Sequence, residues 1–302
     1  MAAVGDWIRE IRGPFLALSV VLVFLGTSVA AHEGVFDLVR ALLALIGLVL
    51  LHISVNVFNE CSDYHTGIDF NTSPTPFSGG SGMLVQGRIA PSSAYAVAVA
   101  SFTLAVLIGG VFVWLTNVWL LPLLVVGAVT VLCYTTFLAK IALGEIFAGL
   151  GLGLLPVLGC AFVQTGHYSP AAFAAGVPSG ILTFNLLLIN EFPDLDADVK
   201  GGRKNLLIVY GPETAGKIYT ALFAFAYVWI VAAVALKIFP VYCLAALLTL
   251  PIAYKPMMWA WRDIANKEAM VPALGANVMT NLVCHALLGM GFVAAILLEG
   301  RV

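Results

Sequence analysis

Two short acidic segments, each at the end of an apolar stretch, are the parts of this chain best suited to chemistry. The first, N-E-C-S-D, covers residues 59–63, and the second, N-E-F-P-D, covers residues 190–194. Both follow the pattern N-E-x-x-D, and their offset is constant, because 190 − 59 and 194 − 63 both equal 131. An amide and a carboxylate four residues apart lie on one face of a helix. Each segment therefore predicts a row of oxygen ligands at a helix end.

Both rows extend beyond their segments. Asn56 lies one helical turn before Asn59, and Asp198 lies one turn after Asp194, provided that the helix continues through Pro193. Several carboxylates in one cavity raise one another's pKa unless a cation neutralises them. Mg²⁺ prefers oxygen ligands and is often held by a few carboxylates together with substrate phosphates. The alternative, that these residues only cap solvated helix ends, explains one segment better than two matched copies.

Basic and aromatic residues accompany the acidic segments. Cationic donors that follow or flank them, and that a diphosphate would require, are Arg12, Arg88, Lys140, Lys200, Arg203 and Lys204. The usual cytoplasmic excess of Lys and Arg explains most of them equally well. Tyr134 closes an apolar stretch on the same side, where an aromatic ring faces a carbocation or anchors the membrane interface. The glycines and hydroxyls of residues 76–82 are able to approach an anion.

The composition of the chain indicates what kind of structure positions these residues. The chain is 61% hydrophobic and only 10% charged, with a mean hydropathy of +1.02, whereas soluble domains are about 25% charged. Apolar stretches near the roughly 20-residue spanning length run at 14–31, 36–58, 94–115, 118–138, 144–164, 171–192, 216–236, 238–256 and 272–298. The sequence therefore predicts an all-α, polytopic membrane bundle of about nine transmembrane helices in a single domain, residues 1–302.

Charge predicts the orientation of this bundle. With nine alternating helices, 11 of the 14 Lys and Arg share one side, and only Arg40, Lys237 and Arg301 lie on the other. Basic residues concentrate on cytoplasmic loops. We therefore expect a cell-membrane protein whose N-terminus and acidic segments are cytoplasmic and whose C-terminus is outside. The first apolar stretch resembles a signal peptide, but Asp6 and Glu10 spoil the basic region of such a signal, so we expect it to be retained.

Four helices separate the two acidic segments, so both lie on the same membrane side. The simplest account is an internal repeat of two four-helix units with a ninth helix appended, enclosing a central cavity that is capped on the cytoplasmic side. A net charge of −2 argues against nucleic acid as a partner. Five scattered cysteines without a C-x-x-C pair argue against a disulfide framework or a zinc site.

With these features the sequence resembles the UbiA superfamily of intramembrane prenyltransferases, and most of all its menaquinone branch, the 1,4-dihydroxy-2-naphthoate polyprenyltransferases. Residues 56–69 are similar to that branch's N-x-x-N-D-x-x-D-Y-x-x-G-x-D, and residues 190–206 to its D-x-x-x-D followed by G-R/K-x-x-L. The segments 12–14, 86–87 and 144–145 also match. Departures are Glu60 in place of Asp, Gly67 at the third acidic position of the wider superfamily, Ser73-Pro74 in place of R-P, and the absence of prolines in residues 135–143.

The resemblance implies Mg²⁺-dependent transfer of a polyprenyl group from its diphosphate to an aromatic, naphthoate-type acceptor within the lipid bilayer. It implies that Mg²⁺ is held by Asn59, Asp63, Asp69, Asn190, Asp194 and Asp198. Expected diphosphate-binding residues are Arg12, Lys140, Arg203, Lys204 and Asn56. We expect Asp63, Asp194 and Tyr134 to take part in catalysis. No obligate protein partner is implied.

Other functions are compatible with parts of the pattern. A secondary transporter also uses repeated helix bundles, but its charged groups are expected near the middle of the membrane rather than at helix ends. Membrane alcohol phosphotransferases use clustered aspartates, but their D-x-x-D-G-x-x-A-R pattern is missing. A purely structural membrane protein does not explain the matched segments. Within the superfamily, hydroxybenzoate, other quinone precursors and lipid glycerols remain alternative acceptors.

Overall fold

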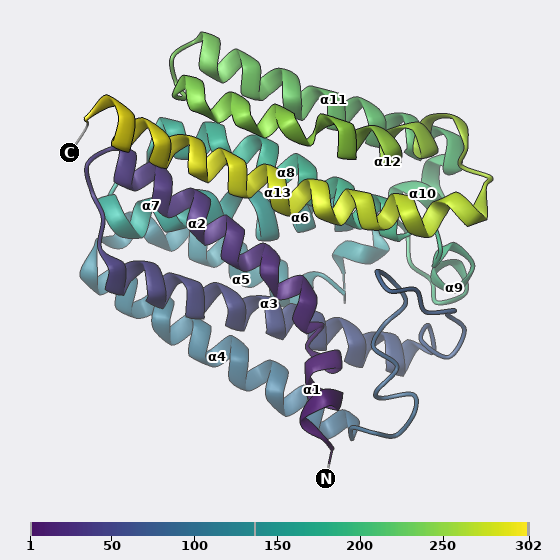
Figure 1. Cartoon of the computed structure of the whole chain (residues 1–302). Coiled ribbons are helices and arrows are strands. Elements are labelled where there is room, and N and C mark those ends of the chain that lie inside the picture. The colour runs from purple at the N-terminus through teal and green to yellow at the C-terminus, as the bar shows by residue number, and fades with distance from the viewer. Residues whose placement is uncertain (1, 136, 301–302) are drawn as a thin grey trace.

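The computed structural model describes residues 2–135 and 137–300. Throughout this part of the chain the regular structure is helical (Figure 1). Eight helices are long and apolar enough to cross a membrane, and Val118–Cys133 is a ninth, shorter apolar stretch. The predicted all-α membrane bundle is therefore confirmed. Arg301, placed on the outer side by the sequence argument, lies outside the described residues.

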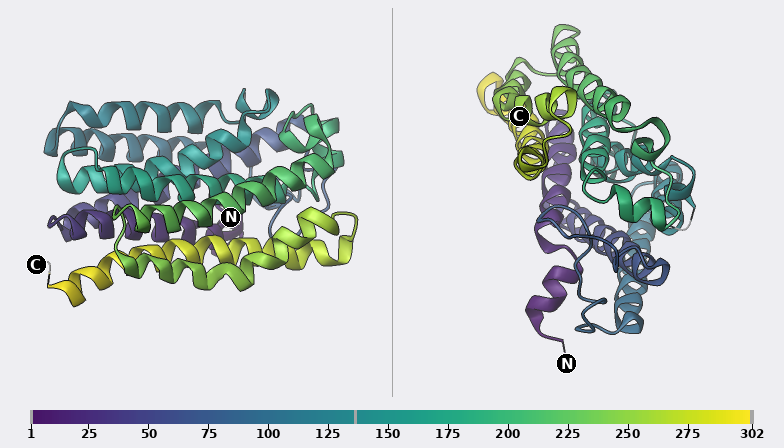
Figure 2. Two further views of the ribbon diagram at one scale, coloured as in Figure 1. Left: turned by 90° about the horizontal axis from the view of Figure 1, so that it is seen from above. Right: turned by 90° about the vertical axis from the view of Figure 1, so that its right-hand side faces the viewer.

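The elements follow one another in a simple order. They are α1 (Val4–Glu10), η1 (Gly13–Leu16), α2 (Ala17–His32), α3 (Leu38–Thr66), α4 (Pro91–Leu115), η2 (Val118–Leu120), α5 (Leu121–Cys133), η3 (Leu138–Lys140), α6 (Gly144–Gly149), η4 (Leu150–Leu154), α7 (Leu155–Thr165), α8 (Pro170–Asn190), α9 (Leu195–Lys200), α10 (Leu206–Tyr210), α11 (Pro212–Ala235), η5 (Val241–Thr249), α12 (Leu250–Arg262) and α13 (Lys267–Glu299). Figure 2 shows the long helices lying side by side along one common direction.

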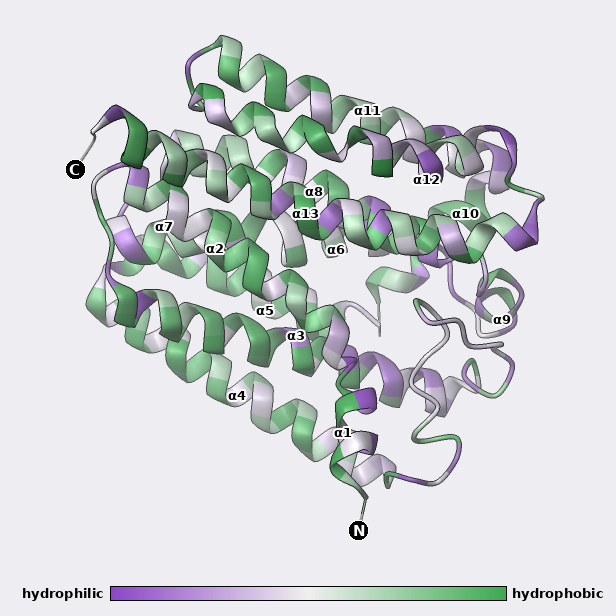
Figure 3. Ribbon diagram, in the orientation of Figure 1, coloured by the Kyte–Doolittle hydropathy of each residue, from purple (hydrophilic) through white to green (hydrophobic). Residues whose placement is uncertain are grey.

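The outside of the bundle is apolar. Large side chains such as Trp114, Leu107 and Leu248 are exposed, which a water-facing surface would avoid but a lipid-facing one requires. Hydrophobic residues cover the long helices in Figure 3, while hydrophilic ones gather around α9 and at the ends of the bundle. The hydrophilic residues around α9 lie at the end of the bundle where α3 and α8 finish.

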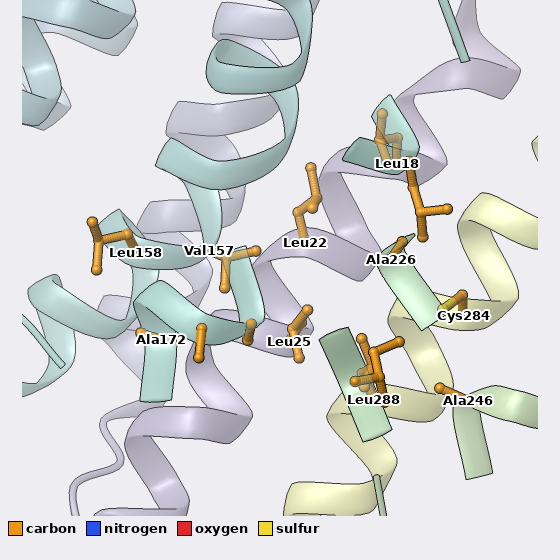
Figure 4. Close-up of a cluster of buried hydrophobic side chains, with 14 of the residues drawn as sticks. Leu18, Leu22, Leu25, Val157, Leu158, Ala172, Ala226, Ala246, Cys284 and Leu288 are labelled. Atoms are coloured by element: carbon orange, nitrogen blue, oxygen red, sulfur yellow. The ribbon is translucent and has the colours of Figure 1, made fainter. Parts of the chain in front are cut away.

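Helix α2 is the central element, packing against α3, α7, α8 and α13. Close approach to α7 depends on Gly26, where an added Cβ would lie 2.5 Å from the backbone oxygen of Val157. Small residues allow this kind of backbone contact in lipid. Figure 4 shows the resulting core, in which Leu22 and Leu25 lie between Val157 and Leu288.

The two helices that carry the acidic segments end differently from their predicted bounds. Helix α3 continues to Thr66, so the first segment is helical throughout, whereas α8 stops at Asn190. Turns cover residues 191–194, and α9 starts at Leu195. The condition that the helix continues through Pro193 is not met, because proline lacks an N–H and disfavours the helical conformation of the residue before it.

One further irregularity lies between α6 and α7. Residues Leu150–Leu154 form a π-helical turn in which Leu152 has φ −118° and ψ 31°. The hydroxyl of Thr183 on α8 donates to the backbone oxygen of Leu152 at 2.8 Å. A π turn in a membrane helix widens the backbone and is common beside functional cavities. Leu152 and Thr183 both line the cavity described next.

Candidate active site

A single cavity collects side chains from both acidic segments. Its wall includes Asn59 and Asp63 at the end of α3, Asp69 in the following loop, Asn190 at the end of α8, Asp194 in the turn and Asp198 on α9. We call these six residues the acidic rim. The loss of helix at Pro193 does not scatter them, because the turn folds the second segment back toward the same space.

Arg203 connects the two halves of the rim. Its Nη2 atom donates to Asp63 Oδ2 at 2.6 Å and to Asn59 Oδ1 at 3.1 Å, and its Nη1 atom donates to Asp198 Oδ1 at 3.3 Å. Asn59 Nδ2 also donates to Asp63 Oδ2 at 2.9 Å. The planar guanidinium suits this role because its several N–H donors bind carboxylates on two sides at once. Arg203 thus holds positive charge between α3 and α9.

One guanidinium does not neutralise all the carboxylates of the acidic rim. Asp69 Oδ2, Asn190 Oδ1 and Asp194 Oδ1 are buried without a hydrogen-bond partner. Burial, together with the neighbouring carboxylates Glu60 and Asp63, raises the pKa of Asp69 to about 8. Burial and then Asp198 raise the pKa of Asp194 to about 7. Positive charge bound beside these two carboxylates would favour their ionised form.

Glu60 belongs to the first acidic segment but does not line the cavity. Its carboxylate accepts the backbone N–H of Ser81 at 2.7 Å and of Gly82 at 3.2 Å, and the Ser81 hydroxyl at 2.6 Å. Arg12 Nη2 lies 3.5 Å from its Oε2 atom. Glu60 therefore fixes the loop between α3 and α4 and orients Arg12, which does face the cavity.

The loop that Glu60 fixes brings glycine backbone to the rim. Gly79 and Gly80 have φ values of +88° and +71° and line the cavity with Ser78. A Cβ on Gly80 would lie 2.7 Å from Asp69 Oδ1, so a larger residue would displace that carboxylate. Part of the glycine- and serine-rich segment thus lies at the cavity, and its approach to an anion stays a prediction.

The remaining predicted site residues divide into two groups. Arg12, Asn56 and Tyr134 line the cavity, and Asn56 Nδ2 donates to the backbone oxygen of Ile11 at 3.1 Å. Lys140 and Lys204 are exposed and are not among the lining residues. The structure does not bring these two lysines to the site.

The backbone explains where the two lysines lie. Lys204 N–H donates to Ala139 O at 3.0 Å, and Ala142 N–H donates to Lys204 O at 2.8 Å. These bonds join the loop before α6 to the loop before α10. The pairing leaves the lysine side chains on the outer face while Arg203, the preceding residue, turns inward.

Three further ionisable or amide side chains line the cavity although the sequence analysis assigned them no role. Glu191 is buried, and burial followed by the nearby Glu145 raises its pKa well above the ordinary value. His52 and Asn281 line the apolar part of the cavity on α3 and α13. Glu191 lies inside a recognised segment. His52 lies one helical turn before Asn56 on α3, and Asn281 lies one turn after Asn277 on α13, so the i,i+4 spacing of polar residues is the signal that could have found them.

The residues of the rim fit a hard divalent cation. Among the described residues no three acidic, histidine or cysteine side chains form a preassembled cage. Carboxylate and amide oxygens nevertheless face one space from two sides, and three of these oxygens lack any partner. Magnesium sites that use one or two carboxylates and complete the shell with substrate phosphates have this donor set.

Comparison with known proteins agrees with this architecture. The profile of the UbiA prenyltransferase family matches residues 19–280. The chain belongs to this family, and it is a multi-pass membrane enzyme of the prenyltransferase class. The 1,4-dihydroxy-2-naphthoate octaprenyltransferase of Bacillus subtilis is 31% identical over 296 residues, covering 96% of this chain and 93% of that protein. The enzyme of the same name from Escherichia coli is 27% identical, with 94% of each chain covered.

Solved structures show the same fold. The apo structure of a UbiA homolog from Aeropyrum pernix aligns with a TM-score of 0.72 at 19% identity, covering 93% of this chain and 98% of that one. A UbiA homolog from Archaeoglobus fulgidus, solved with DMAPP and Mg²⁺, aligns with a TM-score of 0.64 at 17% identity, covering 94% of this chain and 99% of that one.

Proposed function

We propose that this enzyme transfers a polyprenyl group from an allylic diphosphate to a naphthoate-type aromatic acceptor in a Mg²⁺-dependent reaction. One observation carries the proposal: two acidic segments from distant parts of the chain converge at one end of a largely apolar cavity, with buried oxygens left unpartnered. The naphthoate acceptor is favoured by the names of the Bacillus subtilis and Escherichia coli relatives.

The acidic rim would hold Mg²⁺ through Asn59, Asp63, Asp69, Asn190, Asp194 and Asp198. When bound, the metal would supply positive charge that stabilises the charge developing on the diphosphate leaving group. The Archaeoglobus neighbour solved with DMAPP and Mg²⁺ supports this assignment. The loop at Gly79 and Gly80 lets backbone approach the same end of the cavity.

Arg203 and Arg12 would bind the diphosphate beside the metal. Arg203 spans the two halves of the rim, and Arg12 faces the cavity from the start of the first membrane segment. Fixed cationic donors lower the cost of charge build-up on a departing oxygen. Lys140 and Lys204 are not part of this proposal, because neither side chain lines the cavity.

The apolar wall would bind the prenyl chain and protect the reactive carbon. Phe15, Leu18, Val131, Phe147, Leu186 and Leu187 are among the lining residues. Loss of the diphosphate leaves a positive allylic carbon that water would quench, so a dry cavity is required. Tyr134 lines the cavity close to Gly144, where an added Cβ would lie 3.8 Å from its ring. We assign its ring the role of stabilising this cation.

The acceptor carbon would then attack the allylic carbon, forming a C–C bond, and the ring would lose a proton.

The orientation of the enzyme in the membrane is also part of the proposal. The excess of Lys and Arg at the end that carries the acidic rim favours a cytoplasmic site and N-terminus, and the whole chain is expected to act as one domain.

A transfer assay tests the proposal. Purified enzyme is incubated with farnesyl or geranylgeranyl diphosphate, Mg²⁺ and a panel of aromatic acceptors that includes 1,4-dihydroxy-2-naphthoate. We expect a prenylated naphthoate product whose formation stops when EDTA removes the metal. If product forms only with a different acceptor, that acceptor replaces the naphthoate in the proposal. Absence of both product and diphosphate release with every acceptor would overturn the proposal.

A further inference from the structure

Asn281 is the one buried side chain among the described residues with two polar atoms that lack a partner. It lies on α13, is 1% exposed and lines the cavity, yet neither Oδ1 nor Nδ2 forms a hydrogen bond. An unpartnered buried amide destabilises a fold, so its presence calls for an explanation. A ligand that supplies both an acceptor and a donor would provide one.

The position of Asn281 separates it from the acidic rim. On α13, Gly275 packs against Phe77 of the loop that borders the rim, with an added Cβ 3.1 Å from the ring. Asn281 lies six residues further along, which at the helical rise of 1.5 Å is about 9 Å deeper into the bundle. The amide therefore lies deeper in the cavity than the acidic rim.

A second polar group lies at the same depth. His52 on α3 precedes Asn59 by seven residues, or about 10 Å, and it lines the cavity. Its Nδ1 atom is 3.0 Å from Ser19 Oγ on α2, so Nε2 is the ring nitrogen left for a ligand.

Contacts between α13 and α2 show where Asn281 lies along the bundle relative to Ser19. Gly289 of α13 packs against Phe24 and Leu25 of α2, and the two helices run in the same direction (Figure 1). Asn281, eight residues before Gly289, is therefore level with the start of α2 near Ser19. Asn281 and His52 thus reach the cavity at about one level.

We propose that Asn281, with His52, binds an oxygen substituent of the aromatic acceptor and so selects acceptors that carry a second ring oxygen. The assignment rests on the prenyl-transfer function proposed above. A prenyl chain offers no hydrogen bond, so an amide facing it would stay unsatisfied. A phenolic hydroxyl donates and accepts, which matches Oδ1 and Nδ2 of one amide.

The chain offers a matched control for this residue. Asn277 is one turn earlier on α13 and is also 1% exposed, but it is not a lining residue, and its Oδ1 accepts the Tyr219 hydroxyl at 2.8 Å. Replacement of each asparagine by leucine, which has the same branched shape and the same number of side-chain heavy atoms, should separate binding from structure. Asn277→Leu leaves a buried tyrosine hydroxyl unpaired, whereas Asn281→Leu removes an already unpaired amide.

The test measures steady-state kinetics and thermal unfolding of both variants. For Asn281→Leu we expect the KM for the dihydroxynaphthoate acceptor to rise about tenfold, the loss of roughly one hydrogen bond. Its KM for the prenyl diphosphate and its rate of diphosphate release at saturating acceptor should be unchanged, and its Tm should be equal or higher. Asn277→Leu should lower Tm without changing the ratio of the two KM values.

A substrate analogue provides a second measurement. Wild-type enzyme should prefer 1,4-dihydroxynaphthalene to 1-naphthol, and this preference should collapse in Asn281→Leu and in the smaller Asn281→Ser variant. The proposal would be overturned if a folded Asn281 variant kept the wild-type KM for the acceptor and the wild-type preference between the two analogues. The amide would then bind water rather than the acceptor. Absence of diphosphate release by the wild type would overturn the prenyl-transfer proposal and this one together.

Discussion

At the scale of single residues, an aspartate just after the second acidic segment provides a control for that segment. Asp194 lines the cavity with Oδ1 unpartnered, whereas Asp196, two residues later, is exposed and outside the cavity. We expect Asp194→Ala to lower the rate of prenyl transfer by at least about 100-fold, because removal of a group that stabilises transition-state charge has effects of this size. Asp196→Ala should stay within about twofold of the wild type, since surface substitutions have small effects.

The measurement is the initial rate of product formation at saturating substrates and Mg²⁺. A matched thermal unfolding curve for each variant shows that both are folded. Substantial activity of Asp194→Ala, or equal loss in the two variants, would contradict the assignment of the rim.

Residue identity predicted only part of this site. The acidic pattern pointed to Asn59, Asp63 and Asp194 because equal spacing at two helix ends is visible in the sequence. The sequence does not show in which direction a side chain points. Glu60 turns to the loop at Ser81 rather than to the cavity, and Lys204 turns outward while Arg203 turns inward.

At the scale of elements, hydropathy predicted how many helices there are better than how each one is built. The predicted stretches correspond to the eight long helices and the shorter Val118–Cys133. Hydropathy does not record hydrogen-bond pattern, so it missed the π turn at Leu150–Leu154. It also placed the end of α3 too early, because the polar residues after residue 58 are helical but no longer apolar.

Close packing beside the π turn depends on glycine. A Cβ on Gly153 would lie 2.6 Å from the Gly180 Cα atom and 2.6 Å from the Ser179 backbone oxygen on α8. Backbone atoms of a packed helix have little room to move, so we expect Gly153→Ala to cost about 1–3 kcal/mol of unfolding free energy. The Tm in detergent should fall accordingly.

Gly159 on α7 is the control for this substitution. An added Cβ there meets no atom within 4 Å, and alanine favours helix over glycine. Gly159→Ala should therefore leave Tm unchanged or raise it. Equal Tm values for the two variants would show that the contact between η4 and α8 is not tightly packed.

At the scale of the whole molecule, a bundle of mostly hydrophobic helices (Figure 3) carries a dense group of acidic residues at one end. Folding brings these carboxylates together although they repel one another, since α3 and α8, which both end at the rim, pack against α2 and bury their apolar faces. The bundle therefore supplies the free energy that holds the rim in place. This balance depends on how many rim carboxylates are ionised, so it is sensitive to pH and to cations.

The sign of this dependence follows from the pKa values. Burial and neighbouring carboxylates raise the pKa of Asp69 to about 8 and that of Asp194 to about 7 in the folded protein, against about 3.9 for an unfolded aspartate. Between about pH 4 and pH 8 the folded state thus binds more protons than the unfolded state, so the stability of the metal-free protein falls as pH rises through this window.

Thermal unfolding between pH 6 and pH 8.5 tests this expectation. In EDTA we expect Tm to fall as pH rises, by a few degrees. With saturating Mg²⁺ and a prenyl diphosphate, Tm at the high end of the range should be restored, because a ligand that binds only the folded state stabilises it and favours the ionised carboxylates. The double variant Asp69→Asn/Asp194→Asn, which cannot titrate at these positions, should show a flatter Tm profile in EDTA. A metal-free wild type whose Tm rises with pH over this range would contradict the assignment of a repulsive, cation-binding rim.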